Sequence, residues 1–462
     1  MSVTLLPAAA QLALLRRHTI TPLELAEEHI AQIERLNPSL NAFADFDARR
    51  VRSQTRKPNR GPLFGLPVTV KSSISVAGQR CETGSTLNRG LVPDKNAVLV
   101  DRLIAAGALI LGTTNCPEFL MAYETENLLH RSTRNPWNVE HTSGGSSGGE
   151  AAAIAAGMSA AGLGSDSGGS VREPAHFTGI CALKPTPGRF PSAGHLPPCL
   201  GPFAFLGSIG PMARTVDDLQ LLFANLSGQD PMDPSSAPIT YRPVSRQEAK
   251  RTTIGWFEDD GNVPVTSETR EAVRQAAQAL ERQGFKVKPF RPKWLEAARR
   301  LWWTFFMQCG AMLYAPAIRG REQELSPTFR DFLGLARSAP PLTADSLLEA
   351  WVESDRVRAR LLEEMRLFPI LLSPVCSIPA FKPFERSWTV DGQTVGYLDA
   401  MRYTQWFNLL GAPAAVVPVS RSAQGLPIGV QIAGRPYADE LVLEVAAAVE
   451  SAFGYQPPPL AL

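Results

Sequence analysis

The sequence predicts an α/β fold in which a mixed central β-sheet is covered by helices on both faces, an α/β/α arrangement. Short apolar segments rich in β-branched residues alternate with amphipathic helical segments along the chain. Several of the apolar segments are hydrophobic throughout, as strands covered on both faces are. With 462 residues, 44% of them hydrophobic and 19% charged, the chain has the composition of a globular protein with a large core.

The first elements place a lysine at the end of a strand. A helix is predicted over residues 22–36, with Thr21 as its N-cap and Glu24 completing a capping box. After a stretch punctuated by glycine and proline, the β-branched residues 68–70 predict a short strand. This strand ends directly at Lys71, so we expect the lysine where the strand leaves the sheet.

The remaining elements continue the alternation between helix and strand. In chain order they are a helix over 96–106, a strand over 108–111, helices over 150–156 and 215–228, a strand over 253–257, a helix over 267–283, and strands over 286–288, 370–374 and 414–418. Proline, aspartate and serine are frequent near 229–245. We therefore expect one domain over 1–462, with a soft internal boundary there between two halves.

Charge and cysteine spacing exclude several classes of function. The 46 basic and 44 acidic residues give a net charge of +2 without long runs of one sign, so no nucleic-acid partner is expected. The six cysteines are scattered without zinc-ligand spacing, which predicts no metal site and favours a reducing, cytoplasmic location. No segment has the roughly 20 apolar residues of a membrane span, so no membrane partner is expected.

Two clusters of glycine and serine carry the chemical signal. The first reads Ser-Gly-Gly-Ser-Ser-Gly-Gly over 143–149, and the second reads Gly-Ser-Asp-Ser-Gly-Gly-Ser-Val-Arg over 164–172. Dense glycines let backbone N–H groups approach a ligand, and the turn before Ser170 could form a nest for a developing oxyanion. A flexible linker and a phosphate cradle are the alternatives. The flanking alanine-rich helix opposes the first, and the absence of a G-x-x-x-x-G-K-[ST] pattern opposes the second.

A serine nucleophile in this region needs a base other than histidine. The G-x-S-x-G pattern at 145–149 would require a histidine late in the chain, yet no histidine follows His195. A lysine can serve instead, because desolvation lowers the pKa of its amine. A strand-terminal lysine such as Lys71 is by itself more often a surface residue, and its combination with the two serine clusters favours the catalytic interpretation.

With these motifs the chain resembles the amidase signature family over roughly residues 20–455. The Gly-Gly-Ser-Ser-Gly-Gly run, the Asp-x-Gly-Gly-Ser-x-Arg run and the strand-borne lysine of that family are all present. The resemblance implies Ser170 as nucleophile, Ser146 as a bridging serine on a cis peptide, and Lys71 as terminal base. It also implies an amidase that works through an acyl-serine and needs neither metal nor cofactor.

In such a triad, neutral Lys71 takes a proton from Ser146, and Ser146 takes one from Ser170 as Ser170 attacks the amide carbonyl. The predicted oxyanion hole consists of four backbone amides, those of Ser167, Gly168, Gly169 and Ser170. The side chains predicted to orient the catalytic loop are those of Asp166, Arg172 and Ser147.

One departure from the family pattern and two alternative functions have to be considered. Many relatives carry Asp-Asn after the lysine, where this chain has Ser72 and Ser73. The A subunit of tRNA-dependent amidotransferases, which releases ammonia from glutamine, is the alternative function. Its substrate-holding aspartate belongs to a Tyr-x-Asn-Asp-like stretch, and the matching residues 399–406 here, at and around Met401, lack the Asn-Asp pair. An inactive homologue that only binds a ligand is a further alternative.

The substrate prediction is an amide with a small apolar or aromatic acyl group. The segment Trp302 to Met307, with residues 312–314 beyond it, predicts either an apolar acyl pocket or a helix buried in the core. Trp406 and Phe407 carry the same two interpretations. A homodimer is what many members of the family suggest.

Overall fold

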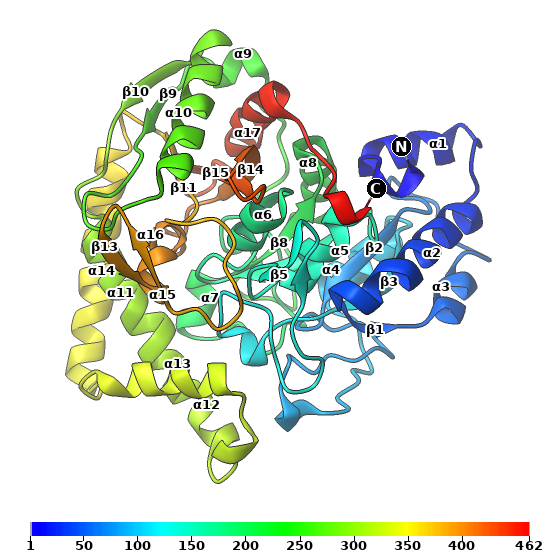
Figure 1. Ribbon diagram of the computed structural model, residues 1–462, viewed down its shortest axis with the longest axis horizontal. Coiled ribbons are helices and arrows are strands. Elements are labelled where there is room, and N and C mark those ends of the chain that lie inside the picture. Colours follow the sequence, from blue (N-terminus) through cyan, green and yellow to red (C-terminus); the bar gives the residue numbers. More distant parts are fainter. Residues whose placement is uncertain (1, 462) are drawn as a thin grey trace.

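A computed structural model describes residues 2–461 and confirms the α/β prediction (Figure 1). Its centre is an 11-stranded mixed sheet. In spatial order the strands are β1 (Phe43–Phe46), β3 (Leu109–Thr114), β2 (Pro67–Lys71), β6 (Ala161–Asp166), β8 (Ser208–Ala213), β7 (Cys181–Lys184), β14 (Ala414–Arg421), β15 (Pro427–Gly434), β11 (Ile370–Pro374), β9 (Thr253–Trp256) and β10 (Lys286–Pro289). Two small pairs lie outside it, β4 (Arg134–Asn135) with β5 (Asn138–Thr142), and β12 (Ser387–Val390) with β13 (Gln393–Gly396).

Helices cover both faces of the sheet. They are α1 (Ala8–Arg16), α2 (Pro22–Leu40), α3 (Ala48–Gln54), α4 (Val98–Ala105), α5 (Gly148–Ala155), α6 (Arg172–Thr178), α7 (Pro202–Leu206), α8 (Val216–Leu226), α9 (Arg246–Ala249), α10 (Ser267–Arg282), α11 (Leu295–Trp303), α12 (Cys309–Ile318), α13 (Pro327–Ser338), α14 (Ala344–Glu364), α15 (Tyr397–Ala400), α16 (Arg402–Leu410) and α17 (Asp439–Phe453). None of the helices in the described chain is long and apolar enough to cross a membrane.

The side chains of the strands alternate between two apolar layers. On β11, Ile370 and Leu372 enter the core formed with α1, α4, α8, α10 and α17, whereas Leu371 enters the core formed with α11 to α14 and α16. On β3, Ile110 and Leu111 divide in the same way between the first core and the one under α2, α3 and α5. This period of two explains why these strands read as hydrophobic throughout.

The sheet is continuous across the predicted internal boundary. β7, from the first half of the chain, pairs antiparallel with β14, from the second half, with Lys184 opposite Ala414. The side chain of Arg172 also reaches from α6 in the first half to Gln431 on β15. We therefore propose that the whole chain folds as one domain, in which 229–245 is a connection between two parts of one sheet.

The predicted elements are present, with shifted ends. The capping box between Thr21 and Glu24 is formed at the start of α2. That helix continues through Pro38 to Leu40, beyond the predicted end at 36, and stops at Asn41, whose φ is 54°. Proline removes one helical hydrogen bond, and here the loss falls in the last turn, where the helix tolerates it.

Sequence patterns did not indicate β6, although it carries part of the site. Its sequence, Ala-Gly-Leu-Gly-Ser-Asp, is poor in β-branched residues. A Cβ at Gly162 would lie 1.9 Å from Glu150 Oε1, and a Cβ at Gly164 would lie 2.7 Å from Ser147 Oγ. The glycines are therefore required because α5 and the turn before it pack directly on this strand.

The helices α11 to α14 form a group at one side of the molecule, yellow-green to yellow in Figure 1. Between α11 and α12 the chain makes a π-helical turn at Thr304–Gln308. The inner side of this group, Trp302 included, faces the turn that follows β6, because the Trp302 indole bonds to Ser167. The group thus covers the region where the glycine-rich clusters meet.

Candidate active site

Lys71 lies at the end of β2, with no exposed surface. Its Nζ donates to three serine hydroxyls, Oγ of Ser146 at 2.7 Å, of Ser147 at 3.0 Å and of Ser165 at 3.2 Å. Burial lowers the pKa of Lys71 to about 8, although nearby acidic groups oppose the shift. An amine with this pKa is partly neutral near physiological pH and can accept a proton.

The buried carboxyl of Glu150 lies near Lys71 and does not bond to its amine. Glu150, in the first turn of α5, accepts hydrogen bonds from the hydroxyls of Thr69 and Thr114. Burial raises the pKa of Glu150 to about 8, despite these bonds and the charge of Lys71. Glu150 is thus largely protonated at neutral pH, which limits how far it raises the pKa of Lys71.

The two serines that replace Asp-Asn do not contact the lysine amine. Ser72 Oγ lies 3.3 Å from Cys116 Sγ, and Ser73 Oγ lies 3.4 Å from His195 Nε2. Lys71 is positioned instead by the serines of β6 and of the turn before α5. The replacement therefore leaves the hydrogen bonds of the amine complete.

Ser146 and Ser170 come from different turns and border one small cavity. The peptide bond between Gly145 and Ser146 is cis, as the family resemblance implied. Ser147 N donates to Ser170 O at 3.1 Å and so joins the two turns. No direct hydrogen bond between the Ser146 and Ser170 hydroxyls is formed within the described chain. Ser170 is 8% exposed and also lies on a larger cavity, whereas Ser146 is 1% exposed.

The carbonyls of the turn before Ser170 all have donors. Trp302 Nε1 donates to Ser167 O at 2.9 Å, Thr404 Oγ1 donates to Gly168 O at 2.7 Å, and the first turn of α6 donates to Gly169 O at 2.8 Å. In a trans peptide the N–H points opposite to the carbonyl of the same plane. Each of these bonds therefore also fixes the direction of the next amide.

The four predicted oxyanion donors divide into two groups. Gly169 N–H donates to Asp166 Oδ1 at 2.9 Å and is engaged. Within residues 2–461, the N–H groups of Ser167, Gly168 and Ser170 have no hydrogen-bond acceptor. Gly169 has a φ of +127°, and a Cβ there would lie 2.4 Å from Thr404 Oγ1, so the turn requires glycine. Three backbone amides without an acceptor therefore lie in the turn at Ser170, and such groups can bind an anion.

A buried ion pair supports this turn. Both oxygens of Asp166 accept from Arg172 at 2.9 Å, and neither side chain is exposed. Burial alone would raise the pKa of Asp166, but the Arg172 charge and hydrogen bonds hold it well below its usual range. Arg172 also donates to Asn408 at 2.5 Å and to Gln431 at 2.6 Å. The guanidinium therefore connects the turn to α16 and β15.

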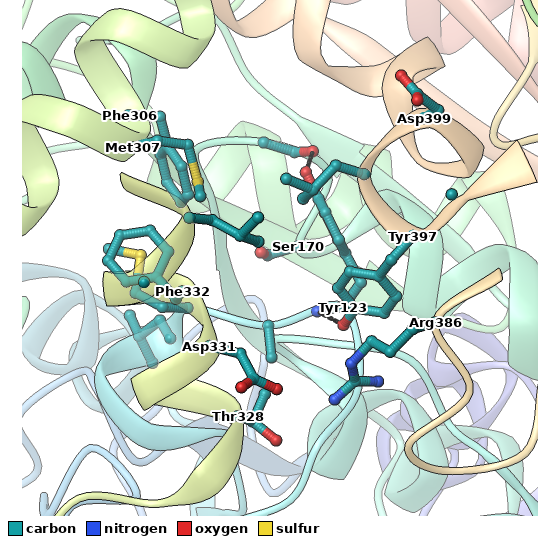
Figure 2. Close-up of a pocket in the computed structure, with 18 of the residues that line it drawn as sticks. Tyr123, Ser170, Phe306, Met307, Thr328, Asp331, Phe332, Arg386, Tyr397 and Asp399 are labelled. Carbon is teal, nitrogen blue, oxygen red and sulfur yellow. Dashed lines mark hydrogen bonds between the residues drawn. The ribbon is translucent and has the colours of Figure 1, made fainter. Parts of the chain in front are cut away.

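A cavity of about 620 Å³ opens over Ser170 (Figure 2). Phe306, Met307 and Phe332 line one side, and Tyr123 and Tyr397 line the other. Its more polar end carries the side chains of Thr328, Asp331 and Arg386. The cavity is therefore mainly apolar next to the serine and charged away from it.

The segment 302–314 combines the two interpretations that the sequence left open. Trp302, Phe306 and Met307 line the cavity, whereas Phe305 is completely buried in the core. The side chains of residues 312 and 313 are exposed by 55% and 51%. The segment therefore contributes some side chains to the cavity wall and others to the core.

Trp406 and Phe407 have 0% and 1% exposure and belong to the core.

Sequence reasoning missed two residues of the site. Ser165 contacts Lys71 because β6 lies beside β2, and this pairing follows only if the glycine-rich segment is recognised as a strand. Tyr123 donates from its hydroxyl to Gly168 O at 3.2 Å and lies in an irregular segment without a local pattern. Its position was not predictable from periodicity.

No group of histidine, cysteine, aspartate or glutamate that could hold a metal occurs in the part of the chain that the structure describes.

Three similar proteins show the range of the relatives. Indoleacetamide hydrolase of Bradyrhizobium diazoefficiens is 31% identical over 459 residues, which cover 96% of this chain and 85% of that protein. The A subunit of the glutamyl-tRNA(Gln) amidotransferase from a Roseiflexus species is 34% identical over 472 residues, covering 94% of each chain. The structure of 6-aminohexanoate cyclic dimer hydrolase complexed with substrate matches with a TM-score of 0.88 and 28% identity, covering 99% of this chain and 100% of that one.

The mixed sheet and these relatives define the class as hydrolases of carbon–nitrogen bonds. The chain belongs to the Amidase family, whose model matches residues 24–443. The resemblance drawn from the serine and glycine motifs is thereby confirmed.

Proposed function

We propose that this protein is an amidase that hydrolyses an apolar or aromatic carboxylic amide through an acyl-enzyme on Ser170. The observation that carries the proposal is the buried contact of 2.7 Å between Lys71 Nζ and Ser146 Oγ, placed beside a serine that opens onto a large cavity. A buried amine next to a hydroxyl can remove its proton, which an exposed lysine at neutral pH cannot do.

The proposed reaction starts with two proton transfers. Neutral Lys71 accepts the proton of Ser146, and Ser146 accepts that of Ser170, whose Oγ bonds to the carbonyl carbon. The hydrogen bond between the two serines forms when substrate is bound, as catalytic hydrogen bonds often do. The oxyanion accepts from the free amides of Ser167, Gly168 and Ser170. The Gly169 amide joins them only if it gives up its bond to Asp166.

The second half of the reaction returns the protons. Ser146 donates a proton to the amide nitrogen, the C–N bond breaks, and Lys71 reprotonates Ser146. A water molecule then loses a proton through the same path and attacks the acyl-serine. The carboxylate leaves and Ser170 regains its proton. Asp166, Arg172 and Ser147 take no proton in this scheme, and their role is to hold the turn and the lysine.

A glutamine-hydrolysing subunit is the second candidate, because of the relatives that bear that name. Met401 stands where the substrate-holding aspartate of such subunits is expected. It is completely buried in an apolar cluster and does not line the large cavity. The carboxylate of the same stretch that does line this cavity, Asp399, pairs with Arg299. This arrangement favours the stand-alone amidase.

The six cysteines are all free thiols, which supports the proposed location in the reducing cytoplasm.

The test is release of ammonia and carboxylate from aliphatic, aryl and fatty amides and from glutamine. We expect turnover of simple amides that Ser170→Ala abolishes, while the exposed-site control Ser338→Ala keeps it. Mass spectrometry during turnover should find the acyl group on Ser170. Turnover of glutamine alone would support the amidotransferase function, and binding of amides without turnover would support an inactive homologue.

A further inference from the structure

Two cavities of very different size meet at Ser170. The large one measures about 620 Å³ and the small one about 30 Å³. Ser170 lines both, whereas Ser146, Ser165 and Ser167 line only the small one. The carbonyl carbon bonded to Ser170 carries two groups, the acyl chain and the nitrogen. The two cavities can therefore be assigned to these two groups.

The position of the proton donor decides the assignment. In the proposed reaction the leaving nitrogen must take a proton from the Ser146 hydroxyl, so it has to lie within hydrogen-bond distance of that oxygen. Ser146 borders the small cavity and not the large one. The nitrogen is therefore directed to the small cavity, and the acyl group is left with the large, mainly apolar one.

The small cavity leaves almost no room beyond the nitrogen itself. Its volume of about 30 Å³ is about a twentieth of that of the large cavity, so it can take a small group such as an amino group and has little room for a substituent on that group. One part of its wall consists of aromatic side chains packed on one another. The rings of Phe119 and Tyr314 lie 4.9 Å apart, and those of Phe203 and Phe306 lie 5.8 Å apart. Such walls do not move aside for a phenyl or alkyl substituent without repacking.

The polar wall of the small cavity suits an N–H group. His195 Nδ1 lies 2.8 Å from Pro197 O, and a carbonyl can only accept, so Nδ1 carries the proton. Burial lowers the pKa of His195 to about 4, which keeps the ring neutral and leaves Nε2 as an acceptor. The partner of Nε2, Ser73 Oγ, is 3.4 Å away, a long bond that can be exchanged. An NH₂ group or ammonia can supply a donor to this acceptor.

We propose that the substrates are primary carboxamides with bulky, largely apolar acyl groups, and that ammonia is the first product. The inference rests on the proposed amidase function and narrows it, because N-substituted amides are excluded by the size of the small cavity.

The test uses amides that share one aryl-alkyl acyl group and differ only at nitrogen, namely the primary amide, the N-methyl amide and the anilide. We expect kcat/KM to fall by at least about 100-fold from the primary to the N-methyl amide, and further for the anilide. Equal rates, or a preference for the anilide, would overturn the inference and leave the amidase function intact. Absence of turnover with all three, and with the wider amide panel, would remove both.

Two variants locate the cause of the discrimination. Phe203 lines only the small cavity, so Phe203→Ala should raise the rate on the N-methyl amide relative to the primary amide by about 10-fold or more. Phe332 lines only the large cavity, and Phe332→Ala should change the preferred acyl group while leaving that ratio unchanged. A ratio that changes with Phe332→Ala and not with Phe203→Ala would reverse the assignment of the cavities. If Phe203→Ala does not fold, Cys199→Ala enlarges the same cavity by a smaller amount.

Discussion

Lys71 Nζ lies 2.7 Å from Ser146 Oγ, and both side chains are almost completely removed from solvent. The same burial that lowers the pKa of the amine also shields the proton path from water. This contact lies at the end of β2, which pairs with β3 on one side and with β6 on the other. The pH dependence of the reaction should therefore reveal the pKa of Lys71.

We expect kcat/KM to rise with pH and to level off above about pH 8. The neutral amine is the active form, and burial places the pKa of Lys71 at about 8. Below that pH the neutral fraction, and with it the rate, falls about 10-fold per unit. A pH profile with a neutral primary amide measures this. A rate that stays constant between pH 6 and pH 9 would exclude Lys71 as the base.

Removal of the base should cost activity without unfolding the protein. Lys71→Ala is expected to reduce kcat by about 10²–10⁴-fold, the usual range for loss of a general base. Ser146→Ala should cause a loss of the same order, because it interrupts the same proton path, and the double variant should be little worse than either single one. Steady-state kinetics with circular dichroism as a folding control measure this. Additive losses would indicate separate roles.

Asp166→Asn should destabilise the fold as well as the site. It removes the charge that compensates the completely buried Arg172, and breaking such a pair costs about 3–5 kcal/mol. The surface pair of Arg366 with Glu363, whose side chains are 66% and 67% exposed, provides the control. Glu363→Gln should change the free energy of unfolding by less than about 1 kcal/mol. Urea denaturation of both variants compares the two; similar values would contradict a stabilising role for the buried pair.

Filling the large cavity should change acyl selectivity. Leu335, on α13, lines this cavity, and Leu335→Trp is expected to reduce kcat/KM for long or aryl acyl groups while sparing short ones. Leu348, on α14, is 64% exposed and does not line the cavity, so Leu348→Trp is the matched control. A series of primary amides of increasing acyl length measures the effect. An equal response to both variants would show that the acyl group lies elsewhere.

The sequence was most informative where local patterns and chemistry coincide. Lys71 could be placed at a strand end because a β-branched run precedes it, and the glycine-rich turn before Ser170 was expected to carry free amides. The engagement of the Gly169 amide by Asp166 could not be foreseen, since it depends on the direction of one peptide plane. Ser165 was missed because β6 contains glycines, which weaken the sequence pattern of a strand. These glycines are required by the close packing of α5 and of the turn before it. Tyr123 reaches the site from an irregular segment, which has no hydrophobic periodicity from which its position could be predicted.

The order of strands in the sheet has a consequence for the synthesis of the chain. β14 and β15, residues 414–434, lie between β7 and β11, so the last strands to be made occupy the middle of the sheet. Until they emerge from the ribosome, β7 is an open edge, and Arg172 lacks its partner Gln431 on β15. The nascent protein therefore carries its serines and lysine long before their support is complete. The supporting contacts of this site must wait until residues 414–434 have been made, and a chain that stops before residue 414 would have an unpaired strand, prone to association with other chains.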